Sequence, residues 1–133
     1  MQDFQYCRPQ SVAEAVALLA EHGPGARILA GGTDLVIGLR TNEIRPTAVI
    51  DLKRISELRP GIRRENGCLC ISATAVMTDI ENDEVVRRHF PALAEAASTV
   101  GSVQIRNRAT MVGNICNASP AADTAPPLLV YEA

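Results

Sequence analysis

Two adjacent glycines, Gly31 and Gly32, follow an apolar segment and precede an amphipathic one. Glycine permits positive φ and lets a ligand approach the main chain closely. The amides of such a loop, with those that open a following helix, form a cradle suited to phosphate. Thr33 adds a hydroxyl, and Asp34 lies where a carboxylate favours a helix start. The loop lacks the lysine of a Walker motif and the third glycine of a dinucleotide fingerprint, so a purely structural turn stays an alternative.

A second candidate site runs from Thr110 to Asp123 around Gly113. Thr110 and Asn114 supply neutral hydrogen-bonding groups, and the carboxylate of Asp123 is an acceptor of the kind that holds ribose or ribityl hydroxyls. Taken alone, this segment also suits a bulged loop whose polar side chains satisfy nearby backbone groups. Two loops suited to phosphate binding, followed by such a carboxylate, predict one long diphosphate ligand between two lobes.

Hydrophobic periodicity in the first part of the chain predicts the elements that position the first loop. The expected elements are a helix capped by Ser11 and Glu14 that ends at His22, strands over 27–30 and 48–52, and a helix over 34–39 capped by Thr33 or Asp34. Strand, glycine turn, helix and strand form a βαβ unit, which normally carries a parallel pair of strands.

The pattern changes after Arg54, where short strands and helices alternate less regularly. The expected elements are a hairpin of 61–64 and 68–73 around Asn66-Gly67, a short helix opened by a capping box at Thr78 and Glu81, a helix over 91–97, a strand over 103–105 and a helix from Pro127. This change predicts a boundary near residues 54–60, with lobes over 1–55 and 56–133.

Composition narrows the function classes. Of 133 residues, 47% are hydrophobic, and 13 basic residues balance 15 acidic ones, which argues against binding to nucleic acid. The four cysteines lack metal-ligand spacing and predict free thiols in a reducing compartment. Because no secretory signal or apolar run of membrane-spanning length is visible, we expect a soluble cytoplasmic protein.

Two segments carry a resemblance to a known family. Residues 30–35 (AGGTDL) and 101–130 (GSVQIRNRATMVGNICNASPAADTAPPLLV) closely resemble the flavin subunit of the xanthine dehydrogenase and carbon monoxide dehydrogenase family, as does the opening over 4–19. The resemblance implies a two-lobed α+β fold of the vanillyl-alcohol-oxidase type, with a small βαβ lobe, a mixed lobe and FAD between them. Family flavin domains continue beyond the equivalent of Ala133, so the chain resembles a truncated domain.

The resemblance also implies positions for the cofactor. The implied FAD-binding residues are Ile28, Leu29, Ala30, Gly31, Gly32, Thr33 and Asp34 in the first loop, Val100 and Gly101 near the flavin ring, Thr110, Gly113 and Asn114 at the diphosphate, and Asp123 at a flavin hydroxyl. The family's second loop reads Thr-Ile-Gly-Gly-Asn, whereas Val112 replaces the first glycine here. A β-branched residue disfavours positive φ, which predicts weaker diphosphate binding at this loop.

In similar proteins, a molybdopterin-binding large subunit oxidises the substrate, and electrons pass through a [2Fe–2S] subunit to FAD and then to NAD⁺ or another acceptor. The resemblance therefore implies an electron-transfer flavoprotein subunit, an oxidoreductase component without a catalytic acid, base or nucleophile of its own. Val112 and the point at which the sequence ends motivate a second hypothesis, a flavin-free scaffold or assembly domain of the same complex that binds partner subunits through the Arg106–Arg108 region and the Ala-rich helix. A self-contained flavin oxidase is a third.

Overall fold

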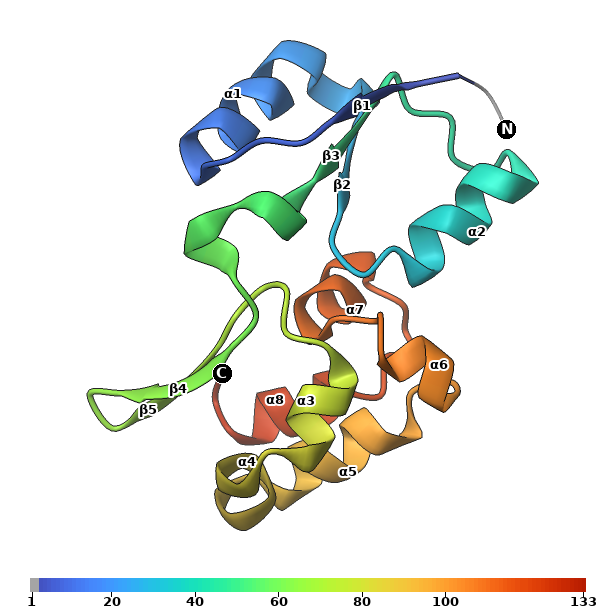
Figure 1. Cartoon of the computed structure of the whole chain (residues 1–133). Coiled ribbons are helices and arrows are strands. Elements are labelled where there is room, and N and C mark those ends of the chain that lie inside the picture. Colours follow the sequence, from blue (N-terminus) through green and yellow to red (C-terminus); the bar gives the residue numbers. More distant parts are fainter. Residues whose placement is uncertain (1–2) are drawn as a thin grey trace. The chain divides into compact units, whose positions relative to one another are not determined.

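The computed structural model describes residues 3–133. It forms two compact units, which divide between Arg59 and Pro60 (Figure 1). The assignment of 1–55 and 56–133 as lobes of an FAD-binding domain stays a prediction. The combination of helices with two small sheets belongs to the predicted α+β class.

The first unit is built on a parallel sheet with the strand order β1-β3-β2. Its elements are β1 (Gln5–Cys7), α1 (Val12–His22), η1 (Gly23–Gly25), β2 (Ala26–Leu29), α2 (Thr33–Thr41), β3 (Ala48–Asp51), η2 (Leu52–Arg54) and η3 (Ser56–Leu58). The parallel pair β2–β3 with α2 between them confirms the predicted βαβ unit. The pairing of β1 with the other edge of β3 was not predicted.

Helix α1 begins and ends as its sequence predicts. The hydroxyl of Ser11 accepts a hydrogen bond from the Glu14 amide at 3.2 Å, and the helix ends before Gly23, which has a φ of 52°. The Glu14 carboxylate accepts from the amide of Gln10, not from that of the cap residue. Buried Ala15 joins the apolar core of this unit, whose other buried members are Cys7, Ala26, Ile50 and Ile55.

The second unit combines a hairpin with a cluster of short helices. Its elements are β4 (Ile62–Glu65), β5 (Cys68–Ile71), α3 (Met77–Asn82), α4 (Glu84–His89), α5 (Pro91–Thr99), α6 (Val103–Arg106), α7 (Met111–Asn117) and α8 (Ala125–Val130). The hairpin is confirmed, because β4 and β5 pair antiparallel and Asn66 and Gly67 both have positive φ. The core lies among the helices and includes Met77, Ile80, Val86, Leu93 and Ala97.

Two expectations for the second unit were wrong. The capping box at Thr78 does not form, because the cap residue of α3 is Val76, two residues earlier, and the Thr78 hydroxyl bonds to the side chain of Asn107. The strand predicted over 103–105 is the helix α6, whose first turn is capped by the hydroxyl of Ser102. A strand needs a neighbouring strand for its backbone groups, whereas a capped helical turn satisfies its own.

Candidate functional site

The loop that joins β2 to α2 holds the first predicted site. Gly32 has φ 82° and ψ 5°, in the left-handed region, and occupies the N-cap position of α2. A Cβ added to Gly32 would lie 2.5 Å from Cδ1 of Leu29. The left-handed backbone therefore favours glycine at this position, and a larger residue would also have to displace the Leu29 methyl group.

The start of α2 offers main-chain amides to a ligand. Gly32 has no side chain to cap the helix, and its carbonyl accepts the first intrahelical bond, from the Val36 amide at 2.9 Å. The amides of the preceding first turn have no partner within an α-helix, and the helix dipole favours an anion beside them. The prediction that Thr33 or Asp34 caps this helix was wrong, because the turn needs a left-handed residue there.

The other residues predicted for the first loop lie directly around this turn. Ile28 on β2 is 48% exposed, although its register partner Ile50 is fully buried. A methyl group of Leu29 lies beside Gly32, Ala30 and Gly31 are partly exposed, and Asp34 is exposed. The structure thus brings the continuous segment from Ile28 to Asp34 together as one strand end, one turn and one helix start.

The second predicted site is not a glycine loop but the start of α7. Thr110 is buried at 4% exposure, and its Oγ1 accepts a hydrogen bond from the Gly113 amide at 3.1 Å. A Cβ added to Gly113 would lie 2.7 Å from that oxygen. Neither Gly113 nor Val112 has positive φ, because both lie in the first helical turn. The expectation that Val112 opposes a required positive φ was therefore wrong.

Asn114 is held by a residue that sequence reasoning missed. The hydroxyl of fully buried Thr124 donates a hydrogen bond to Oδ1 of Asn114 at 2.7 Å. That bond uses one acceptor site of the side chain and leaves the NH₂ group of Asn114 as its donor. It also ties the segment that carries exposed Asp123 to α7. Thr124 gave no separate signal, because one threonine beside an aspartate fits any polar loop.

Val100 and Gly101 lie at the end of α5. Val100 is 9% exposed and joins the core of the second unit, whereas Gly101 is exposed and has a φ of 50°. A Cβ at Gly101 would lie 3.0 Å from the side chain of Ile105 on α6. This bend turns the chain from α5 into α6, which leads on to Thr110.

A polar cluster at the end of β3 was also missed. Asp51 is 4% exposed and stands in register with Leu29, the last residue of β2. Its carboxylate accepts a hydrogen bond from the phenol of Tyr6 and another, at 3.0 Å, from the Lys53 amide. The ammonium nitrogen of Lys53 lies 2.6 Å from the same carboxylate. A carboxylate at the carboxyl end of a parallel strand is a signal that sequence reading could have used.

The charge state of this cluster follows from its contacts. Burial raises the pKa of the Asp51 carboxyl, but the hydrogen bonds from Lys53 and Tyr6 outweigh burial and bring that pKa below its ordinary value. The bond to Asp51 is the main cause that raises the pKa of the Tyr6 phenol. The carboxylate form of Asp51 thus holds β1 and the turn after β3 together at the edge next to the first loop.

Other kinds of site are not seen in the described part of the chain. Over residues 3–133, no group of three or more His, Cys, Asp or Glu side chains is arranged to hold a metal ion. No helix in the same range is both long and apolar enough to cross a membrane. All four cysteines are free thiols.

Known proteins resemble this chain over nearly all of its length. A family model described as the FAD binding domain in molybdopterin dehydrogenase matches residues 2–133. The xanthine dehydrogenase FAD-binding subunit of Escherichia coli O157:H7 is 42% identical over 134 residues, which cover 100% of this chain and 46% of the relative. The carbon monoxide dehydrogenase medium chain of Hydrogenophaga pseudoflava is 42% identical over 120 residues, or 90% of this chain and 42% of the relative.

Solved structures share the fold. A carbon monoxide dehydrogenase from Hydrogenophaga pseudoflava that lacks the Mo-pyranopterin moiety superposes with a TM-score of 0.88 at 40% identity, over 92% of this chain and 42% of that one. Quinoline 2-oxidoreductase from Pseudomonas putida 86 superposes with a TM-score of 0.85 at 31% identity, over 92% of this chain and 42% of that one. These neighbours confirm the predicted fold class, and this chain spans less than half the length of its relatives. The chain belongs to the family of FAD binding domains found in molybdopterin dehydrogenases.

Proposed function

We propose that this chain binds FAD as part of the flavin subunit of a molybdenum-hydroxylase-type dehydrogenase. The observation that carries the proposal is the left-handed Gly32, which opens α2 without a side-chain cap and leaves its first amides to a ligand oxygen. A pyrophosphate is the part of FAD that such a helix start suits, because the donors and the dipole act on the same anion.

The first unit is proposed to hold the pyrophosphate through its main chain. Ala30, Gly31 and Gly32 form the turn, and Thr33 and Asp34 contribute the amides of the first helical turn. Ile28 and Leu29 supply apolar surface at the end of β2. An added Cβ at Gly32 would lie 2.5 Å from a methyl group of Leu29, so a larger residue there would disturb the surface that the turn presents.

The second unit is proposed to contribute side chains. The hydroxyl of Thr110 can donate to a phosphate oxygen while it accepts from Gly113, since a hydroxyl has both capacities. The NH₂ group of Asn114 is a further donor, and exposed Asp123 can accept from a hydroxyl of the cofactor. The amide of Gly113 is already used by the cap, so this segment offers one donor fewer than a glycine loop would. We assign the flavin-ring environment to Val100 and Gly101.

When bound, FAD supplies the redox chemistry, which in enzymes of this class relays electrons from [2Fe–2S] clusters to NAD⁺ or another acceptor. The proposed partners are a molybdopterin-binding large subunit and a [2Fe–2S] small subunit. The tasks left to this chain are binding and orientation, so no residue here is assigned as an acid, a base or a nucleophile. We place the complex in the cytoplasm, where the four thiols of this chain stay reduced.

The flavin-free scaffold loses the support that Val112 gave it. Val112 lies partly buried in the first turn of α7, where a β-branched residue needs no positive φ. A self-contained flavin oxidase would need a substrate pocket of its own, and none of the predicted residues is assigned to a substrate. Neither alternative is favoured by a contact in residues 3–133.

The test uses the intact polypeptide that carries this chain. Purified wild-type protein should be yellow, or become so with FAD, and dithionite should bleach its flavin absorbance. Gly32→Ala should weaken FAD binding by at least about tenfold, because a shift of the loop removes aligned donors. Gly67→Ala is the matched control, since Gly67 also has a φ of 82° but no atom lies within 4 Å of its added Cβ. A colourless wild-type protein, or equal FAD affinity in the two variants, would contradict the proposal.

A further inference from the structure

Helix α6 links two of the segments assigned to FAD. It starts directly after Gly101, with Ser102 as its cap, and ends at Arg106, four residues before Thr110. The Ala109 amide bonds back to the carbonyl of Ile105 at 2.7 Å, so a hydrogen-bonded turn joins the end of the helix to the cap of α7. The position of α6 therefore sets both the bend at Gly101 and the start of α7.

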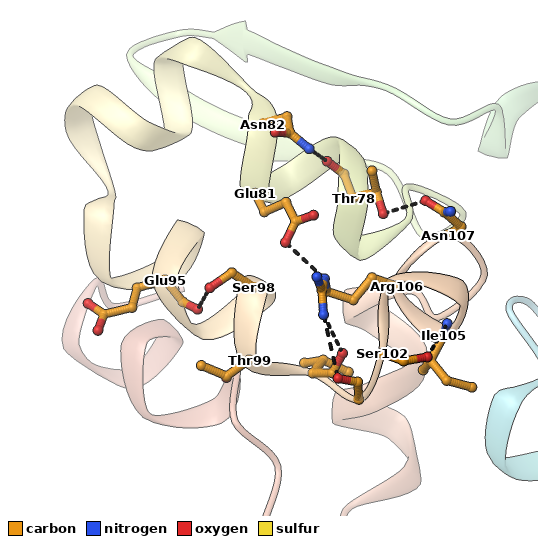
Figure 2. A network of polar contacts seen from close by, with 12 residues as sticks. Thr78, Glu81, Asn82, Glu95, Ser98, Thr99, Ser102, Ile105, Arg106 and Asn107 are labelled. Carbon is orange, nitrogen blue, oxygen red and sulfur yellow. Dashed lines mark hydrogen bonds and ion pairs between the residues drawn. The ribbon is translucent and has the colours of Figure 1, made fainter.

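Arg106 bonds back to the chain that precedes its own helix. One terminal nitrogen donates to the carbonyls of Val100 and Gly101, at 3.4 and 3.5 Å. Its Nε lies 3.0 Å from Oε2 of Glu81 on α3, an ion pair whose angle does not meet hydrogen-bond geometry. Only 15% of the arginine side chain and 16% of the glutamate side chain are exposed. Figure 2 shows Arg106 between Glu81 and the bend that follows α5.

Helix α3 holds the neighbouring residue as well. The hydroxyl of Thr78, three residues before Glu81 on α3, donates to Oδ1 of Asn107 at 2.7 Å (Figure 2). Residues three apart on a helix lie on one face, so one face of α3 binds two successive residues of the 100–114 segment. The start of α3 also bonds to this segment, since the Met77 amide donates to the carbonyl of Ala109 at 2.9 Å.

We propose that Arg106, held by Glu81, is a positioning residue for FAD, an inference that rests on the proposed function. Its guanidinium has enough donors to meet a carboxylate and two carbonyls at once, and a largely buried ion pair fixes its direction. Arg106 thereby fixes the left-handed bend at Gly101 and, through α6, the cap at Thr110. Lysine keeps the charge but lacks the planar fork, so it cannot make the same three contacts.

The experiment compares Arg106→Lys and Glu81→Gln in the intact polypeptide with Arg108→Lys as the matched control. Arg108 is exposed, lies two residues further along and receives the same substitution. Three quantities are measured: the Kd for FAD, the thermal midpoint of the flavin-free protein, and amide hydrogen exchange over residues 100–106 without flavin. The exchange measurement reports the order of the bend independently of any enzyme activity.

Arg106→Lys should raise the Kd for FAD about tenfold and speed amide exchange at the bend, because lysine cannot keep the ion pair and both carbonyl bonds together. Glu81→Gln should act in the same direction to a smaller extent, and Arg108→Lys should stay within about twofold of wild type. An Arg106→Lys variant with wild-type FAD affinity, or with a lower thermal midpoint alone, would overturn the inference. Wild-type protein that binds no FAD would instead overturn the proposed function itself.

Discussion

The cap of α7 gives a prediction whose size follows from its geometry. Thr110→Val replaces the hydroxyl with a methyl group of similar size at a site that is 4% exposed. The Gly113 amide, 3.1 Å from Oγ1 in wild type, then loses its acceptor. Loss of an N-cap costs about 0.5–2 kcal/mol, and the partly buried setting of this amide favours the upper part of that range. We expect a loss of about 1–2 kcal/mol in the free energy of unfolding.

Urea unfolding of the intact polypeptide, followed by circular dichroism, measures this loss as a lower midpoint with an unchanged m value. Thr110→Ser is the control, because it removes a methyl group but keeps the capping oxygen. The Gly113 amide should also exchange faster with solvent in Thr110→Val than in Thr110→Ser. If valine leaves the midpoint unchanged, or if serine lowers it equally, then the hydroxyl does not hold this helix and the reasoning fails.

Three further predictions concern local contacts, each read from urea midpoints of the intact polypeptide. The lowered folded-state pKa of Asp51 gives stability that is fully present above about pH 4 and is lost as the pH falls through the folded value, so Asp51→Asn should flatten this acid dependence. The raised pKa of Tyr6 gives stability that is present below about pH 10 and is lost as the pH rises through the folded value, and Tyr6→Phe should remove that alkaline loss. Gly113→Ala should destabilise the fold by about 1 kcal/mol although alanine favours helices, because its Cβ would displace the cap oxygen of Thr110. Gly61→Ala is the control and should not destabilise the fold, because no atom lies within 4 Å of a Cβ added there. An acid dependence unchanged in Asp51→Asn, an alkaline loss that persists in Tyr6→Phe, or a stabilised Gly113→Ala would contradict these assignments.

Local signals predicted the elements well where one mechanism dominates. The Ser11 cap, the Gly23 stop and the Asn66-Gly67 turn each depend on a few neighbouring residues, and each is found as predicted. The βαβ unit followed from alternating apolar segments around the Gly31-Gly32 turn. In these cases the chain's own backbone requirements determine the structure, without help from distant residues.

Tertiary contacts decided the parts that sequence reasoning missed. The short segment 103–105 fits a strand or a helix equally well. The cap at Ser102 selects the helix, and β4 and β5 pair only with each other, so neither strand is a partner for this segment. Thr78 matched a capping box, but its hydroxyl bonds to Asn107, 29 residues away. The contact between Tyr6 and Asp51 spans 45 residues and depends on the pairing of β1 with β3.

The candidate site was predicted more by resemblance than by geometry. Alone, the Gly31-Gly32 turn fitted a structural loop as well as a phosphate site, and the structure adds the missing feature, a helix start without a side-chain cap. The expected cost of Val112 was wrong, since neither Val112 nor Gly113 has positive φ, and Gly113 instead lies against the side chain of Thr110. A loop and the first turn of a helix can share the same Thr-x-x-Gly spacing.

The central claim is that the first amides of α2 bind the pyrophosphate of FAD. The most direct measurement is an experimental structure of the intact polypeptide with FAD. We predict phosphate oxygens within hydrogen-bond distance, about 3 Å, of the amides that follow Gly32, with Gly32 still left-handed. FAD bound elsewhere, with those amides facing solvent or another part of the protein, would contradict the account.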